Sequence, residues 1–96
     1  MRYKVVSIRH SGKIGTRGFK RTDGRYPDRV GRIVDFNIDN VEIGKPLILE
    51  YLEKADGSDY KGYWLQCSLV TGIHFVGDEI GCVETLNSIY ELQKCK

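Results

Sequence analysis

The side chains best suited to chemistry in this chain are the basic and aromatic residues of one segment near its N-terminus. That segment, RHSGKIGTRGFKRTDGRYPDR (9–29), holds seven Lys or Arg residues and four glycines, with only two acids. Arginine presents a planar fork of donors to phosphate oxygens, and glycines let backbone N–H groups converge on an anion. Aromatic rings among these charges can stack on a nucleobase. The segment and its C-terminal neighbour therefore predict a binding site for a phosphorylated ligand, formed by Arg9, His10, Lys13, Arg17, Phe19, Lys20, Arg21, Arg25, Tyr26, Arg29 and Arg32.

The glycines of this segment do not form any of the common phosphate-loop motifs. A Walker A loop needs GxxxxGK followed by Ser or Thr, whereas Ile14 follows Lys13 here. The dinucleotide fingerprint needs GxGxxG between a strand and a helix, and no helix is expected after these glycines. GKIG (12–15) matches the GxxG of a KH domain, but neither flank has a helical pattern. The alternative interpretation is a solvated basic loop whose aromatic residues fill the core.

No residue pattern in the sequence predicts catalysis, a metal site or a cofactor. His10 and His74 are far apart and lack a signature partner, and no Ser/His/Asp order or carboxylate pair is present. Three cysteines without CxxC or Cys/His spacing argue against a disulfide framework and against zinc. We expect Cys67 and Cys82 to be small buried residues in a reducing cytoplasm. We therefore expect a cytoplasmic protein that is not an enzyme.

Charge is unevenly distributed along a chain that is short enough for a single domain (1–96). Residues 1–34 contain ten basic and two acidic side chains, a net charge of 10 − 2 = +8, and residues 35–96 contain five and eleven, or 5 − 11 = −6. A chain polarised in this way is expected to present one positive face or loop. No apolar run approaches the length of a membrane span, so we expect no membrane partner.

The sequence predicts a mostly β or all-β protein. Expected strands cover 3–8, 30–38, 46–53 and 60–70, and two more flank the turn at Gly77-Asp78. Segment 9–29 reads as a long loop or an irregular hairpin, Gly31 as a bulge or a close backbone approach, and Asp56-Gly57 as a hairpin signal. The C-terminal SIYEL (88–92) is expected to be a strand rather than a helix capped by Thr85. We predict a small antiparallel SH3-like barrel or rolled sheet of five to seven short strands with a long basic first loop. Trp64 is expected to serve the core.

Two short stretches resemble known proteins. DRVGRIVDFN (28–37) resembles the start of a KOW or SH3-like element, in which an early strand carries a glycine and a basic loop contacts RNA or a ribosome. VETLNSIY (83–90) resembles a V-x-T-x-N-S-x-Y pattern of small proteins of bacteria and their phages, although Cys67 stands where the accompanying T-S-x-V element has Thr. Some phage proteins of similar size and β-rich build sequester nucleotide signals of host defence. This second resemblance implies that the basic loop holds phosphates and that Asn87 reads a base edge, in the host cytoplasm.

Three functions remain open on these grounds. The first is non-enzymatic binding of a nucleotide or another phosphorylated small ligand, as a sponge for a nucleotide second messenger. The second is an RNA- or DNA-binding KOW/SH3-like barrel, and the third is a protein-interaction inhibitor that docks on an acidic partner surface. The first is favoured because a dedicated nucleic-acid binder of this size more often has a pI above about 9, whereas this chain has 8.4. Exposed edge strands also allow a homodimer or a higher homo-oligomer.

Overall fold

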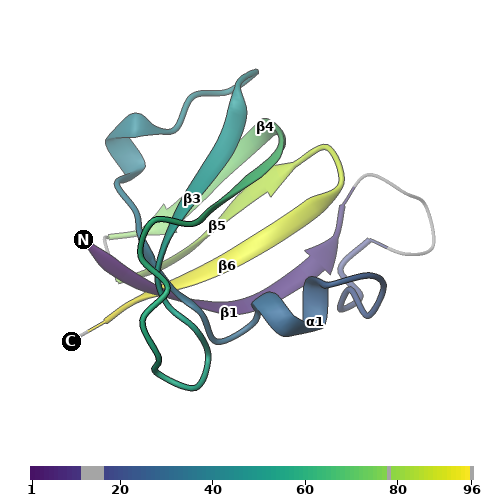
Figure 1. Ribbon diagram of the computed structural model, residues 1–96. Helices are drawn as coiled ribbons and strands as arrows, with labels where there is room; N and C mark the ends of the chain where they lie inside the picture. The colour runs from purple at the N-terminus through teal and green to yellow at the C-terminus, as the bar shows by residue number, and fades with distance from the viewer. Residues whose placement is uncertain (12–16, 78, 96) are drawn as a thin grey trace.

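Most of the chain forms one closed antiparallel β-barrel. The computed structural model describes residues 1–11, 17–77 and 79–95. Among these residues, six strands follow one another around the barrel, and β6 pairs with β1 to close it (Figure 1). The elements are β1 (Arg2–His10), α1 (Tyr26–Arg29), β2 (Ile33–Asp35), the 3₁₀ turn η1 (Ile38–Asn40), β3 (Pro46–Glu53), β4 (Trp64–Val76), β5 (Ile80–Thr85) and β6 (Ser88–Lys94). This confirms the mostly β prediction and is compatible with a small SH3-like barrel.

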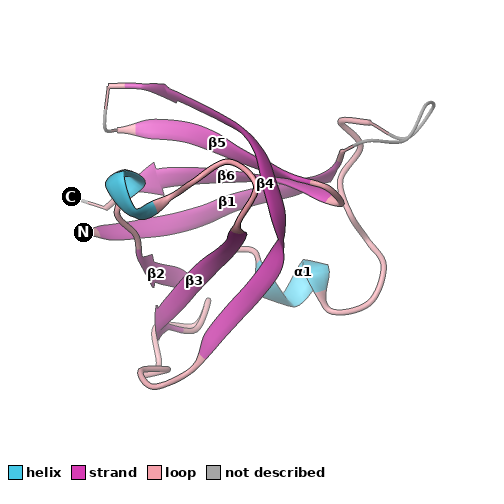
Figure 2. Ribbon diagram, turned by 90° about the horizontal axis from the view of Figure 1, so that it is seen from above, coloured by secondary structure: helices cyan, strands magenta, loops and turns pink. Residues whose placement is uncertain are grey.

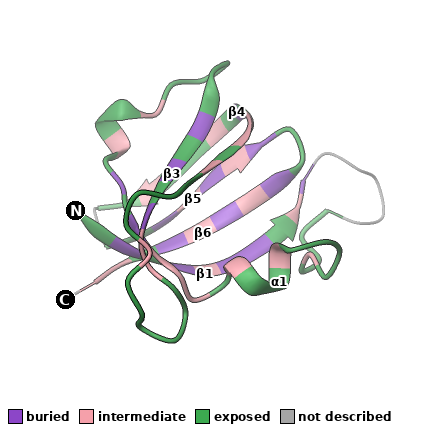
Figure 3. Ribbon diagram, in the orientation of Figure 1, coloured by how far each residue is buried: buried purple, intermediate pink, exposed green. Residues whose placement is uncertain are grey.

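The core fills the barrel because side chains alternate between its interior and its outer surface. Along β3, Leu47, Leu49 and Tyr51 are buried, whereas Ile48 and Glu50 between them are exposed. Figure 3 shows the same alternation along β6. The buried apolar residues are Tyr3, Val5, Ile8, Val34, Phe36, Leu47, Leu49, Tyr51, Val70, Val83, Tyr90 and Leu92. A single layer of strands therefore encloses one core.

β4 is a single strand where the sequence predicted two. The expected break near residue 70 is instead a register shift between Val70 and Gly72, which lets the strand bend and continue to Val76 (Figure 2). Beyond the bend, Phe75 pairs with Gly81 of β5, and a Cβ atom at position 81 would lie only 2.6 Å from the His74 carbonyl oxygen and would overlap the Phe75 ring. The glycine thus makes room for the aromatic ring inside the barrel.

The strand expected over 30–38 is shorter than predicted. β2 covers only Ile33–Asp35, because the chain turns at both ends of it. Before β2, Gly31 has φ +92° and lies so close to the β3–β4 connection that a Cβ there would be 3.1 Å from the Ala55 Cβ, which confirms the predicted close approach. After β2, the Asn37 side chain accepts a hydrogen bond from the Asp39 N–H and starts η1.

The basic segment is an irregular hairpin followed by one helical turn. Its described part folds back on β1: the His10 N–H donates to the Phe19 carbonyl, and the Arg21 N–H donates to the Ile8 carbonyl. The chain then forms α1, which has a proline in its first turn and covers one end of the barrel (Figure 1). The described flanks of the segment therefore pair with each other as the irregular hairpin predicts, and the short helix was not predicted. The predicted C-terminal strand is confirmed as β6.

The Asp56-Gly57 signal is also confirmed, since it lies in the hairpin that connects β3 and β4. Within the described ranges, no helix has the length and apolar character that crossing a membrane requires.

Candidate ligand-binding site

Arginine side chains and tyrosine rings meet at the end of the barrel that α1 covers. The Arg21 guanidinium carbon lies 3.9 Å from the centre of the Tyr26 ring, and that of Arg29 lies 4.7 Å from it. Tyr26 and Arg29 are three residues apart on the single turn of α1, which places their side chains next to each other. The Tyr26 ring also packs against the barrel core. The helix thereby fixes one arginine directly and gives a second one a ring to lie on.

A second group of rings extends this arrangement along the β3–β4 hairpin. The hairpin stacks Tyr51 on Tyr60 at 5.1 Å and Tyr60 on Tyr63 at 4.8 Å between ring centres. Arg32, which follows α1, lies over the first two of these rings at 4.8 and 5.1 Å, and Lys54 lies 5.2 Å from the Tyr60 ring. We call Tyr26, Arg29, Arg32, Tyr51, Lys54, Tyr60 and Tyr63 the arginine–tyrosine face.

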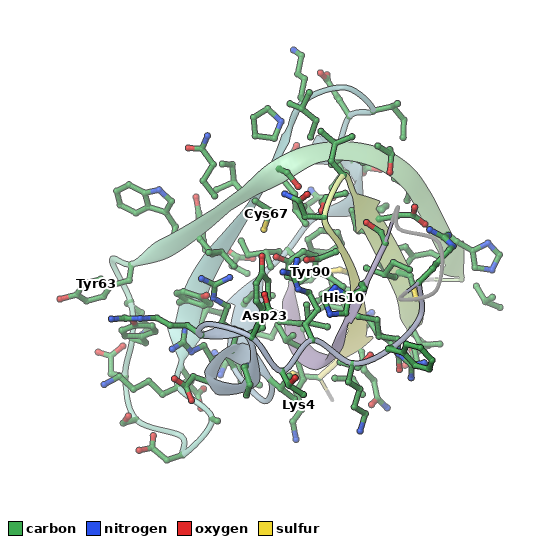
Figure 4. The ribbon with its side chains drawn as sticks, turned by 90° about the vertical axis from the view of Figure 1, so that its right-hand side faces the viewer. Lys4, His10, Asp23, Tyr63, Cys67 and Tyr90 are labelled. Carbon is green, nitrogen blue, oxygen red and sulfur yellow. The ribbon has the colours of Figure 1, made fainter. Side chains whose placement is uncertain are left out.

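Polar side-chain groups of the barrel interior lie next to this face. The Tyr51 hydroxyl is buried, and the Arg32 guanidinium is the polar group beside it. Burial raises the pKa of this hydroxyl, and Arg32 beside it opposes the rise. Tyr90 and Cys67 lie close together at the same end, near the centre of the view in Figure 4, whereas Tyr63 points outward from the rim. Burial raises the pKa of both Tyr90 and the Cys67 thiol, so both stay neutral at physiological pH.

Arg21 holds the basic segment to the β5–β6 turn. One of its terminal nitrogens donates to the Asn87 carbonyl and to the Ser88 hydroxyl, each at 3.0 Å. Its other donors form a bidentate pair with Asp23, at 2.6 and 3.1 Å. This pairing lowers the pKa of the Asp23 carboxyl to about 2. The donors of Arg21 are therefore already occupied within the chain.

Arg29 and Arg32 differ from Arg21 in that no described carboxylate forms an ion pair with either of them, nor with Lys54. A guanidinium whose face rests on a ring keeps its N–H edge available for an oxyanion. A shallow groove of about 330 Å³ runs beside α1, but Asp28 and Asp56 line it together with Arg32 and Lys54. Its charges balance, so the part of the face better suited to an anion is the surface where Arg29 and Arg32 lie over the Tyr26 and Tyr51 rings.

Several other sequence-predicted residues lie away from the arginine–tyrosine face. Arg17 forms a bidentate ion pair with Glu84 of β5, at 2.7 and 2.8 Å. Arg9 is exposed on β1, with its Nε 3.4 Å from the Ser7 hydroxyl. Phe19, Lys20 and Arg25 are exposed. Arg17 is therefore engaged elsewhere, and none of the described contacts joins Arg9, Phe19, Lys20 or Arg25 to Arg29 and Arg32.

His10 and Asn87 lie next to the contacts that Arg21 makes. His10 is half-buried, with Nε2 3.9 Å from an Asp23 carboxylate oxygen. Asn87 is exposed in the β5–β6 turn, and its backbone carbonyl, rather than its side chain, contacts Arg21. Lys13 lies outside the described residues.

Sequence reasoning left most of the rings and the interior polar groups out of the candidate set. Tyr51, Tyr60 and Lys54 reach the face because the β3–β4 hairpin folds them together, and the Asp56-Gly57 turn between them was the available signal. Trp64, expected in the core, is 64% exposed at the start of β4. The cysteines expected to be buried are only half-buried. The described part of the chain contains no cluster of His, Cys, Asp and Glu able to hold a metal ion.

Comparison of the chain with protein-family models, with curated proteins and with solved structures finds no significant match.

Proposed function

We propose that this protein binds a nucleotide-type phosphorylated ligand without transforming it, and that the arginine–tyrosine face is its binding site. The observation that carries the proposal is the pair of ring-stacked guanidinium groups, Arg29 and Arg32, with which no described carboxylate forms an ion pair. Charge-assisted bonds from such groups to phosphate oxygens are among the strongest that a protein surface makes. The buried Tyr51 hydroxyl lies beside Arg32 and supports that end of the face from within the barrel.

A nucleotide suits this face better than a simple anion does, because the face combines cations with exposed π surfaces. Tyr63 ends the stack of three rings and is largely exposed, so its outer side is open to a nucleobase. Phosphates at Arg29 and Arg32 and a base on Tyr63 would use the whole face. Sequestration of a nucleotide second messenger in the cytoplasm is the role that we propose for such a binder.

A second candidate is single-stranded nucleic acid, and one observation favours it. Trp64, the next residue in the chain after Tyr63, is exposed as well. Open aromatic platforms next to cations are typical of surfaces that stack successive bases. A polymer would contact both rings, whereas a mononucleotide or dinucleotide would need only the first.

The test is calorimetric titration and thermal-shift measurement with cyclic dinucleotides, ADP-ribose, ATP and a short oligonucleotide, each over a range of salt. A nucleotide binder gives saturable binding and a higher unfolding temperature with at least one small ligand. A nucleic-acid binder gives affinity that falls steeply with salt for the oligonucleotide alone, and that affinity drops in Trp64→Ala. Absence of heat and of any thermal shift with all four ligands would refute the proposal.

Binding measurements on single-residue variants test whether the ligand binds at the arginine–tyrosine face. Arg29→Gln and Arg32→Gln should each weaken binding about tenfold to a hundredfold, since a charged hydrogen bond is worth roughly 1.5–3 kcal/mol. Lys4→Gln is the matched control, because it removes one positive charge from the outer surface of β1, where Lys4 is exposed. An equal loss in Lys4→Gln would mean that net charge, and not this face, governs binding.

A further inference from the structure

A second concave site lies on the barrel away from α1, between β3 and the segment that carries η1. This groove has a volume of about 540 Å³, within the range of clefts that accept ligands. Val41, Pro46 and Ile48 supply accessible apolar surface, while Asn40 and Glu50 are among its polar lining residues. Figures 1 and 2 show the η1 segment leaving the barrel beside β3.

The groove exists because β2 is too short to cover the whole of β3. β2 pairs with β3 only at Glu50, Tyr51 and Glu53, so Pro46–Leu49 has β4 on one side and no strand on the other. No backbone hydrogen bond joins the described η1 segment to this part of β3. β3 therefore presents an open strand edge inside an otherwise closed barrel.

The direction of the backbone groups at this edge follows from the strand alternation. The Tyr51 N–H donates to the Tyr63 carbonyl on the β4 side, at 2.9 Å. Backbone groups alternate in direction along a strand, so the N–H and C=O of Ile48, three residues earlier, point toward the groove. Unpaired backbone groups at a strand edge are the feature by which a sheet takes up an additional strand.

Charge at the groove favours a basic occupant. Asp35 and Glu50 are directly opposite each other in the β2–β3 ladder, and both are exposed. Like charges in such a pair destabilise the sheet. The ammonium group of Met1 lies 2.8 Å from Asp35, but no described cation pairs with Glu50. A cation delivered next to Glu50 would relieve the repulsion.

We propose that this groove binds a short extended peptide segment of another protein, which pairs with β3 at Ile48, buries apolar side chains against Ile48 and Val41, and places basic side chains beside Glu50. Apolar and basic side chains alternate along this peptide, because successive side chains of an added strand point to the two faces of the sheet. This surface is separate from the arginine–tyrosine face, so its test does not depend on the nucleotide proposal.

The experiment titrates isotope-labelled protein with the probe acetyl-Val-Lys-Val-Lys-Val-amide and follows backbone amide signals by NMR. The expected result is shifts centred on Ile48 and Val41, with protection of the Ile48 amide from hydrogen exchange. The same peptide with Glu in place of Lys should bind about tenfold more weakly. N-methylation of the peptide should abolish binding at alternate positions only, which is the signature of strand pairing.

Protein variants provide the matched control. Glu50→Gln should weaken binding of the Lys peptide several-fold, and Glu79→Gln, at the exposed β4–β5 turn, should leave it unchanged. Shifts confined to the arginine–tyrosine face, equal affinity for the two peptides, or no shift at Ile48 at all would overturn the proposal. Self-association of the free protein that Glu50→Lys abolishes would overturn it too, because the occupant would then be a second copy of this chain.

Discussion

Replacing Arg21 by alanine should destabilise the protein far more than replacing Arg17, although both arginines come from the same basic segment and each forms a bidentate ion pair. The side chain of Arg21 is 13% exposed and that of Arg17 is 55% exposed. Exposed ion pairs contribute little to the free energy of unfolding, because solvent screens them. The difference between the two variants therefore reports the additional contacts of Arg21.

Those additional contacts can be counted. Arg21 donates two hydrogen bonds to the β5–β6 turn, one to the Asn87 carbonyl and one to the buried Ser88 hydroxyl. At about 1 kcal/mol or somewhat more each, with about 0.5 kcal/mol for the contact with the Tyr26 ring, the sum is about 3 kcal/mol. For a domain of this size, that corresponds to a fall of roughly 15 °C in Tm.

The assay is urea and thermal unfolding of the two variants beside the unmodified protein, followed by circular dichroism. Arg17→Ala should shift the midpoint little. Arg21→Lys should recover part of the loss, because an ammonium group keeps the charge but cannot reach the turn and Asp23 with the same planar geometry. Equal losses in Arg17→Ala and Arg21→Ala would refute the reasoning that the turn contacts, and not the ion pair, anchor the segment.

Three further outcomes are expected. Gly81→Ala should lower the free energy of unfolding by about 1–3 kcal/mol, because the added Cβ overpacks the barrel. Gly72→Ala should leave the free energy of unfolding nearly unchanged, because its Cβ would lie at an ordinary 3.8 Å from its nearest neighbour. Chemical denaturation of both variants measures the difference. Arg21 lowers the pKa of the Asp23 carboxyl from 3.8 to about 2, so the contribution of Asp23 to stability is present above pH 4 and is lost as the pH falls toward 2. Because the Asp23 side chain is half exposed, solvent screens this contribution and the loss should be small; denaturation midpoints should show it, and Asp23→Asn should remove it. Burial raises the pKa of the Cys67 thiol, so its alkylation near neutral pH, measured by mass spectrometry, should be much slower in the folded than in the unfolded protein.

The sequence specified the strands well because alternation and turn residues are local signals. Leu47, Leu49 and Tyr51 alternate with exposed residues as a barrel strand requires, and Asp56-Gly57 lies in the hairpin that follows. The lengths of β2 and β4 were harder to predict. Gly31, with a positive φ, delays the start of β2 to Ile33. A bulge after Val70 lets β4 continue where a break between two strands was expected. Both features depend on packing between strands.

The candidate site was predictable only in part, for the same reason. Tyr26, Arg29 and Arg32 lie close together in sequence and were identified from composition. Tyr51 joins them from β3, and the burial of its hydroxyl follows from barrel closure. Trp64 was wrongly expected in the core, because its place in the alternation puts it on the outer surface at the start of β4.

Basic and acidic residues lie in different parts of this sequence, but the fold brings some of them together. The first third of the chain has a large positive charge, yet Arg2 pairs with Glu53 and Arg17 pairs with Glu84, both from the acidic remainder. Closing the barrel brings β1 and the segment after it against strands that carry these acids, so part of the positive charge is neutralised within the fold. Net charge of the segment therefore overstates its capacity for anions. Arg29 and Arg32, which rest on rings rather than beside carboxylates, are the side chains whose removal most directly tests whether this protein binds phosphate.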